Sequence, residues 1–277
     1  MKHVALAVAV VLGLISVPEK AHTSAYTVEP CLKSKLCSGL VDHFQMEEAS
    51  DTARYGAFGS TLHEPVAVNV PQQVTGKIGN AVNFTPSTQF LWSSTFVPSM
   101  STHWSVAFWF KADVLPTNSP NDEKAFVSRR GPDSGSEVVL SGNSPNTYVC
   151  IYTRNREGTS ETATCATGTP IVVGTTYLVV SGVGDPDDTP GGLQSWVSIN
   201  GGAKTTTTLN YVPWPGVSQL RIGQRPSGGK AAAGTMSYDG WIDELSIYGR
   251  SLGPSDIALL CNLSGTCQGR TYPFVTE

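Results

Sequence analysis

Few charges mark this sequence, and they do not gather into a basic stretch. Lys, Arg, Asp and Glu make up 14% of the 277 residues, and the formal net charge is -4. Proteins that bind nucleic acid use clustered Lys and Arg to hold the phosphates, so we expect no nucleic-acid partner. Gly (28 residues) and Pro (18 residues) are plentiful instead. Few charges with many turn-forming residues favour an all-β secreted protein over a helical cytosolic one.

Long apolar runs are lacking beyond the N-terminus. There, Lys2 and His3 precede an uncharged apolar run, Val4–Val17. About fourteen apolar residues are too few to span a membrane, which takes about twenty. The run and the small residues at 23–25 are typical of a cleaved export signal, with an uncleaved anchor as the alternative. We expect a signal peptide over residues 1–25, secretion, and no membrane contact once the signal is removed.

Cysteine motifs for metal binding are also lacking. No CxxC pair and no Cys/His spacing typical of zinc occurs, which argues against a zinc site. In an exported chain six cysteines predict three disulfides, and here they are Cys31, Cys37, Cys150, Cys165, Cys261 and Cys267. The first two and the last two are each six residues apart, and the middle two flank a polar stretch that resembles a hairpin tip. Three local bridges are the simplest interpretation. The alternative links the first two cysteines to the last two.

Alternating apolar residues predict short strands through most of the chain. In the clearest candidate, Trp104–Lys111, every second residue is large and apolar, which places these residues on one face of a strand. They are Trp104, Val106, Phe108 and Phe110, and the opposite face has Ser105, Ala107, Trp109 and Lys111. The other expected strands are Leu40–Met46, Ala81–Phe84, Ala125–Ser128, Glu137–Leu140, Thr147–Thr153, Tyr177–Ser181, Ser195–Ile199, Leu220–Ile222 and Trp241–Tyr248.

One later segment, Pro254–Leu260, is expected to be helical. Gly253 can serve as its N-cap, Pro254 suits the first helical position, and Asp256 favours the positive end of the helix dipole. Many strands with one short C-terminal helix predict an all-β fold, an antiparallel two-sheet sandwich. No repeat, linker or composition shift divides residues 39–263, which we expect to form one domain between a cysteine-containing segment, 26–38, and a tail, 264–277.

Four stretches carry a family resemblance when they are considered together. They are GLVDHFQMEEASDTARYG (Gly39–Gly56), GKIGNAVNF (Gly76–Phe84), WSVAFWFKAD (Trp104–Asp113) and YDGWIDELSIYGRSLGPSDIALLCN (Tyr238–Asn262). Their order and spacing resemble the laminin-G-like jelly roll of the concanavalin A-like lectin/glucanase superfamily. The last stretch is the most specific, because a Gly is followed by a strand with Ile-Asp-Glu-Leu, then an aromatic residue and a helix. The resemblance covers about residues 39–263.

The resemblance implies a scaffold that binds sugars or protein surfaces, often as an appended module or a surface adhesin. It does not fix the ligand, because this fold hosts lectins, glucanases and structural modules. The sequence departs from the usual acidic turn of the family, where it has Asp51 and Gly56. It also has Cys261 where the family commonly has an aromatic residue, which favours a bridge from Cys261 to Cys267.

Asp243 is the first candidate ligand for a metal ion. Alternation along Trp241–Tyr248 places it on the face of Trp241, Leu245 and Ile247, which predicts that it points inward. A buried carboxylate needs hydrogen bonds or a cation. Calcium prefers carboxylate and carbonyl oxygens, and related sandwiches often carry one. Asp243 is therefore either a ligand of a structural Ca²⁺ or a cap on turn amides.

Other acidic residues extend the same two interpretations. Glu47 and Glu48 end the first strand and are candidate ligands for the same ion, or members of a solvated turn. The loop Asp185–Asp188 is a second oxygen-rich candidate, or a polar hairpin loop. Asp239 and Asp243 share a face, as the two acids of a glycosidase would. Asp239 precedes a Gly in an expected turn, however, so we expect no enzyme. The five histidines also show no pairing with a Ser or Cys nucleophile motif such as GxSxG.

Aromatic side chains are the candidate sugar-binding residues. A pyranose has an apolar face and polar hydroxyls, so sugar sites combine aromatic rings with hydrogen-bonding groups. Trp214 is the best candidate because it lies between two prolines in a loop, and it could equally belong to the core. The further candidates are Trp92, Trp109, Tyr148 and Tyr211.

These observations predict a secreted, non-catalytic binding or adhesion module with carbohydrate as the expected ligand. The alternative is a structural subunit of an extracellular or virion-surface assembly, and the third interpretation is a glucanase-type glycoside hydrolase. The expected partners are a glycan or a surface protein, and a homo-oligomer is left open. Structural Ca²⁺ is the one cofactor considered.

Overall fold

The computed structural model describes residues 35–49, 53–64, 70–85, 89–96, 98–117, 122–130, 135–143, 145–185, 192–216, 219–225 and 236–263. The expected signal peptide, the tail at 264–277, Cys31 and Cys267 lie outside these residues, as do Asp51 and most of the loop Asp185–Asp188. A short 3-10 helix, η1 (Lys35–Cys37), precedes the first strand.

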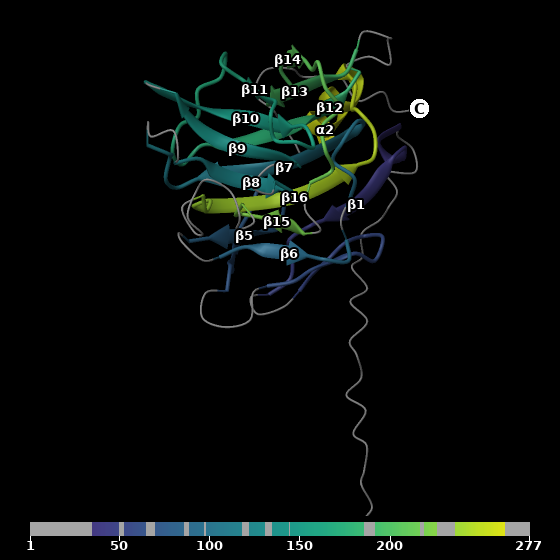
Figure 1. Cartoon of the computed structure of the whole chain (residues 1–277). Coiled ribbons are helices and arrows are strands. Elements are labelled where there is room, and N and C mark those ends of the chain that lie inside the picture. The colour runs from purple at the N-terminus through teal and green to yellow at the C-terminus, as the bar shows by residue number, and fades with distance from the viewer. Residues whose placement is uncertain are drawn as a thin grey trace, which may run out of the picture.

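The larger of two main sheets has eight strands. Its order is β14 (Thr205–Thr208), β13 (Gln194–Ile199), β12 (Thr176–Gly184), β7 (Trp104–Ala112), β16 (Gly240–Tyr248), β5 (Asn80–Phe84) and β4 (Gln72–Thr75). The eighth strand, β1 (Leu40–Phe44), also pairs with β16. All of these pairings are antiparallel. Figure 1 shows β7 and β16 side by side at the centre of the molecule.

The second main sheet has six strands. Its order is β11 (Glu161–Cys165), β10 (Asn146–Arg154), β9 (Gly135–Asn143), β8 (Lys124–Ser128), β15 (Leu220–Ile222) and β6 (Leu91–Ser93). These pairings are antiparallel as well. A separate small hairpin pairs β2 (Arg54–Tyr55) with β3 (Thr61–Leu62). The antiparallel two-sheet sandwich with one C-terminal helix that the sequence predicted is confirmed.

The core lies between the two main sheets. The apolar face predicted for β7 is confirmed, because Val106, Phe108 and Phe110 are fully buried in the main core cluster. Their neighbours there include Phe126 of β8, whose ring centroid lies 4.6 Å from that of Phe110. Fully burying one such side chain contributes about 1.5–3 kcal/mol. This apolar core, in which aromatic rings pack among aliphatic side chains, holds the two sheets together.

The helix α2 (Pro254–Leu263) covers part of the outer face of the eight-stranded sheet. Ile257 and Cys261 of α2 pack in one buried cluster with Trp196 and with Val180 of β12, and Figure 1 places α2 beside β12. Gly253 is the N-cap, since its carbonyl accepts the first helical hydrogen bond, from Ile257, at 3.1 Å. The carboxylate of Asp256 accepts a hydrogen bond from the Gly253 amide at 3.0 Å. Among the described residues no helix is long and apolar enough to cross a membrane.

A β-bulge in β16 corrects the predicted face of Asp243. The register of β16 against β7 shifts between Asp243 and Ser246, and Glu244 has a positive φ of 52°. Before the bulge, Trp241 belongs to the outer cluster; after it, Leu245 and Ile247 belong to the core. The prediction that Asp243 shares its face with Leu245 and Ile247 is wrong, because the extra residue at the bulge reverses the alternation of the side chains along the strand.

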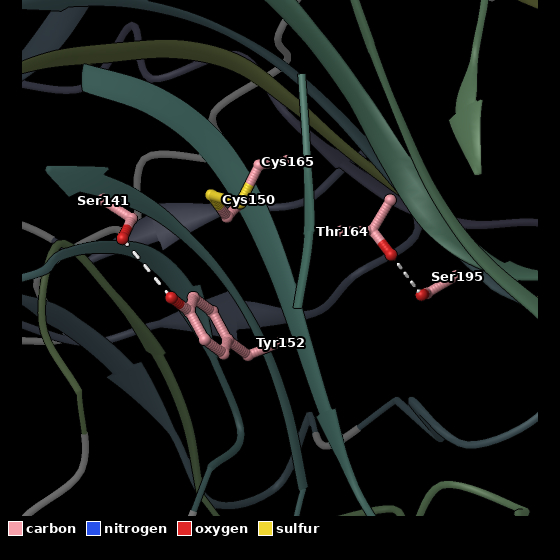
Figure 2. Close-up of a disulfide and its surroundings, with 6 residues drawn as sticks. All are labelled: Ser141, Cys150, Tyr152, Thr164, Cys165 and Ser195. Atoms are coloured by element: carbon pink, nitrogen blue, oxygen red, sulfur yellow. Dashed lines mark hydrogen bonds between the residues drawn. A yellow bond between two sulfur atoms is a disulfide. The ribbon is translucent and has the colours of Figure 1, made fainter. Parts of the chain in front are cut away.

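The disulfide predicted between Cys150 and Cys165 is confirmed. These residues are directly opposite each other on β10 and β11, with an S–S distance of 2.05 Å. Figure 2 shows the bridge between the two strands, with Tyr152 on the same sheet. Cys37 and Cys261 are also disulfide-bonded. Their predicted partners, Cys31 and Cys267, lie outside the described residues, so those two local pairings stay predictions.

Gly182 of β12 provides a test of how closely the central strands approach. A Cβ added there would overlap the carbonyl oxygen of Trp104 on β7. Because both groups belong to paired backbone, we expect Gly182→Ala to lower the free energy of unfolding by about 1–3 kcal/mol. Gly168→Ala is the control, since nothing lies within 4 Å of its added Cβ. Urea denaturation of the two variants measures the difference, and equal midpoints would contradict this account.

Candidate functional site

The outer face of the six-stranded sheet carries aromatic and charged side chains. Its centre is a small cluster of Ala125, Val139 and Cys150, which is separate from the main core. Tyr148 and Tyr152 of β10 and Cys165 of β11 pack against this cluster and are partly buried. Alternation explains the placement, since Val149 and Ile151 between them point into the core.

Tyr152 is held in place from two sides. Its hydroxyl lies 3.3 Å from that of Ser141 on β9, as Figure 2 shows. The guanidinium of Arg130 lies 5.5 Å from the centre of its ring. Burial and the nearby carboxylate of Glu123 raise the pKa of the Tyr152 hydroxyl. The hydroxyl therefore stays protonated at neutral pH and can take part in hydrogen bonds as a donor.

Glu137 is the fully buried centre of an ionic network beside Tyr152. Its carboxylate pairs with Arg130 at 2.6 Å and accepts a bond from Nε of Arg225 at 2.7 Å. Burial alone raises the pKa of Glu137, but the two guanidiniums outweigh burial and lower it below its ordinary value. The charge is thus kept in the folded protein, and removing it would take one carboxylate partner from each of two arginines and destabilise the fold.

The network continues to both sides of Glu137. Arg225 also pairs with Glu123 at 2.6 Å, and Arg130 also pairs with Glu161 of β11 at 2.6 Å. Glu161 in turn pairs with Arg154, its cross-strand partner on β10. Three arginines and three glutamates therefore balance one another over this face. No pattern in the sequence indicates the network, because its members come from separate strands and loops.

Trp214, a predicted binding residue, lies beside the end of β10 at the rim of this face. Its amide donates to the carbonyl of Arg154 at 2.9 Å, and its side chain is 37% exposed. Tyr211, another predicted site residue, anchors the same loop through its hydroxyl, which donates to the carbonyl of Thr153 at 2.7 Å. Tyr211 itself packs against the main core. The fold therefore brings the two residues together: Trp214 exposes its ring, and Tyr211 anchors the loop that carries it.

Of the three remaining aromatic candidates, Tyr148 lies on the open face described above, whereas Trp92 and Trp109 lie apart from Trp214. Trp92 is partly buried on β6, at the opposite edge of the same sheet, and its ring centroid lies 5.6 Å from that of His63. Trp109 faces outward from the eight-stranded sheet and is only 4% exposed, with Lys77 Nζ 5.0 Å from its ring centroid. This burial does not fit an exposed platform for a sugar at Trp109.

Two predicted metal ligands instead hold the turn between β4 and β5. Oδ2 of Asp243 accepts the amides of Lys77 and Ile78 at 2.8 and 2.9 Å. The carboxylate of Glu47 accepts the amide of Asn80 at 3.1 Å and its side-chain nitrogen at 3.0 Å. The glycines at 76 and 79 make room, because an added Cβ at either would strike one of these carboxylates.

The same contacts bear on the calcium hypothesis. Glu48 accepts the amide of Tyr55 at 2.7 Å through Oε1, and its Oε2, like Oδ1 of Asp243, is buried without a hydrogen-bond partner. Within the ranges that the structure describes, no three His, Cys, Asp or Glu side chains form a group that would hold a metal ion. The arrangement of Asp243, Glu47 and Glu48 therefore fits the turn-capping interpretation, and calcium binding stays a prediction.

A buried histidine relay connects β1 to the bulge. Nδ1 of His43 lies 2.8 Å from Oγ of Ser246, and its Nε2 lies 3.0 Å from the Glu244 carboxylate. The three residue types are those of a hydrolase triad, and no sequence pattern predicts their pairing, because His43 is 201 and 203 positions away from the other two. Ser246 is only 6% exposed and lies within a paired strand, so a substrate has little access to it. We assign the relay a role in stabilising the bulge.

Comparison with known proteins gives the family. The family model for the concanavalin A-like lectin/glucanases superfamily matches residues 85–258, more than half of the chain. The chain belongs to this superfamily. The resemblance read from the sequence is thereby confirmed. A search of curated protein sequences found no match to the chain.

Solved structures share the fold at low sequence identity. Domain 4 of AbnA, a GH43 extracellular arabinanase from Geobacillus stearothermophilus, in complex with arabinotriose, has a TM-score of 0.57 and 19% identity, covering 80% of this chain and 98% of that chain. The binding domain of Paraclostridial Mosquitocidal Protein 1 has a TM-score of 0.61 and 15% identity, covering 83% and 53%. The ligand binding domain of Botulinum neurotoxin serotype D, in complex with N-acetylneuraminic acid, has a TM-score of 0.54 and 16% identity. The match covers 82% of this chain and 52% of that chain. The chain spans about half of each toxin domain.

The pKa of Asp243 leads to a prediction about pH. Burial, followed by the charge of Glu244, raises this pKa to about 7. The folded protein then keeps a proton that the unfolded chain releases near pH 4, so the stability of the parent should fall as the pH rises from about 4 to 7. Asp243→Asn keeps an oxygen for the turn amides and carries no charge. We expect the free energy of unfolding of the variant, relative to that of the parent, to increase by about 1–3 kcal/mol as the pH rises from 5 to 8.

Urea denaturation of the parent and the variant at pH 5 and at pH 8 measures this increase in relative stability. Glu157→Gln is the control, since Glu157 is exposed and should leave the pH dependence of the parent unchanged. Melting curves of the parent with added calcium and then with chelator complete the test, and we expect no difference between them. A calcium-dependent melting temperature that is lost in Asp243→Asn would refute turn capping alone and support the metal.

Proposed function

We propose that this chain is a non-catalytic carbohydrate-binding module that binds its glycan on the outer face of the six-stranded sheet. One observation carries this assignment: the two main sheets differ in how their outer faces are covered. On the eight-stranded sheet, α2 packs over the outer cluster, and the tryptophans Trp109, Trp196 and Trp241 are at most 6% exposed. On the six-stranded sheet, Tyr148 and Tyr152 remain partly exposed.

The chemistry of the open face suits a sugar. Partly exposed aromatic rings offer surfaces for the apolar face of a pyranose or furanose. The hydroxyls of Ser141 and Tyr148, together with the side-chain amide of Asn146 that donates to Tyr148 at 3.0 Å, offer donors and acceptors for sugar hydroxyls. The Cys150–Cys165 bridge fixes the two strands beneath these rings, so little ordering is needed when a ligand binds.

The comparisons support this proposal through the fold. The arabinanase domain that matches along 98% of its length was solved with arabinotriose. The toxin domains carry less weight, because this chain spans only about half of each. A glycosidase would need two carboxylates facing one substrate. Asp243, one of the two acids considered, is fully buried and bonded to turn amides, which supports a binding role over hydrolysis.

The setting of the module is also a proposal. The apolar N-terminal segment and the disulfides support export to an oxidising environment. There the module would bind a glycan on a surface or in a matrix, as an adhesion module does.

Tyr148 provides the test of the binding face. We expect Tyr148→Ala to weaken glycan binding at least about fivefold, because stacking of an aromatic ring on one sugar unit contributes of the order of 1 kcal/mol or more. Tyr55→Ala is the matched control: Tyr55 is 49% exposed on the separate β2–β3 hairpin, and its loss should not change binding.

A glycan array identifies the ligand, and titration calorimetry of both variants measures the affinity. Thermal melts of both proteins show that they remain folded. No binding to any glycan would refute the proposed function. Equal affinities for the two variants would place the site elsewhere on the molecule.

A further inference from the structure

Trp214 presents an aromatic ring that the surrounding structure holds in place. Its loop follows β14, and the ring is flanked by Pro213 and Pro215, which restrict the backbone. The Trp214 amide is bonded to the carbonyl of Arg154, and the Tyr211 hydroxyl anchors the start of the loop. The side chain still exposes 37% of its surface. Because the backbone that carries the ring is restrained in this way, less freedom is lost when the ring stacks on a ligand.

Arg156 brings a cation to the same ring. It lies in the turn between β10 and β11, and its guanidinium is 4.8 Å from the centre of the Trp214 ring. The turn is ordered by Asn155, whose side chain bonds Thr159 Oγ1 at 2.9 Å and the amide of Ser160 at 3.2 Å. The position of the cation is thus set by both the turn and the ring.

Arg156 differs from the other arginines of this face in its charge partners. Arg130 and Arg154 share the carboxylate of Glu161, and Arg225 pairs with Glu123 and Glu137. Arg156 is exposed and takes part in no ion pair within the described residues. Its planar fork of donors therefore remains available for an anion in the ligand.

We propose that Trp214 and Arg156 together form a subsite for an acidic sugar, one that carries a carboxylate. This inference rests on the proposed glycan-binding function and adds the class of ligand. The sugar ring stacks on the exposed part of the indole, and its carboxylate accepts two hydrogen bonds from the Arg156 guanidinium. A guanidinium matches a carboxylate in this bidentate way better than an ammonium does.

The negative net charge of the chain means that binding of an acidic sugar depends on the local cation, Arg156. The chain carries a formal net charge of -4, so long-range electrostatics repel an acidic glycan and cannot select for it. Selection must come from a positioned donor next to a stacking surface. Because the pair is at the rim and exposed to water, its contribution should be modest and should weaken with salt.

The experiment compares one sugar with and without its charge. Oligogalacturonate and its methyl ester have the same ring and the same hydroxyls, but only the former is acidic. A second pair, sialyllactose and lactose, tests a carboxylate on another sugar. Calorimetry or bio-layer interferometry at low and at physiological salt measures the affinity of the full chain for each. We expect the acidic member of at least one pair to bind at least about fivefold more tightly at low salt, with the difference shrinking as salt is added.

Three variants locate the effect. Arg156→Gln should remove the preference for the acidic sugar while leaving the affinity for its neutral partner within about twofold. Arg156→Lys should keep part of the preference, since the charge remains without the fork. Trp214→Ala should weaken binding of both members of the pair. Lys204→Gln is the matched control, because Lys204 Nζ lies 4.1 Å from the centre of the Trp196 ring in a second cation–aromatic pair, on the other sheet.

The outcomes separate this inference from the proposed function. Binding of glycans with no preference for acidic sugars, or a preference that Arg156→Gln leaves intact, would overturn the subsite while leaving the carbohydrate-binding function in place. Failure to bind any glycan, charged or neutral, would overturn the proposed function itself. Melting temperatures of all variants within about 2 °C of the parent would show that the changes in affinity do not come from unfolding.

Discussion

The bulge in β16 is the constraint on which both faces of the eight-stranded sheet depend. Before it, β16 pairs with β5 and directs Trp241 outward; after it, β16 pairs with β1 and directs Leu245 and Ile247 into the core. Without the extra residue, either Asp243 would enter a core of aromatic rings or Leu245 and Ile247 would leave it. An unsatisfied carboxylate in that core would cost several kcal/mol. The bulge also lets His43 reach Glu244 and Ser246.

The sequence predicted the fold wherever large apolar residues alternate. The strand Trp104–Lys111 was found because its largest apolar residues alternate, and a period of two is typical of a strand. Both of its faces are buried, one in the main core and the other in the outer cluster. The strands β2, β3, β4, β6, β11 and β14 were missed. They are two to five residues long, and most of their side chains are polar, as in the run of threonines at β14. Of these strands only β6 pairs with a strand far away in the sequence, β15, and the others pair with the adjacent strand of a hairpin.

The candidate site was predicted only in part, for a related reason. Trp214 could be recognised because its two prolines signal a loop, which is a local property. Trp109 could not be recognised as buried, because its face is closed by residues brought from elsewhere, among them α2 and Lys77. Glu137 and Arg225 are 88 residues apart. Electrostatic networks of this kind have no periodicity, and single-sequence patterns therefore do not reveal them.

The two outer faces of the sandwich differ in how their aromatic side chains are kept from water. The eight-stranded sheet buries its tryptophans and is stabilised by apolar contact with α2. The six-stranded sheet keeps partly exposed rings and must remain soluble, and its three arginines and three glutamates serve that purpose by pairing with one another. Such pairing removes net charge from the centre of the face, so the network orients Tyr152 without attracting ions of either sign. Any preference of this face for a charged ligand must then arise at its rim, from a cation that the network does not neutralise.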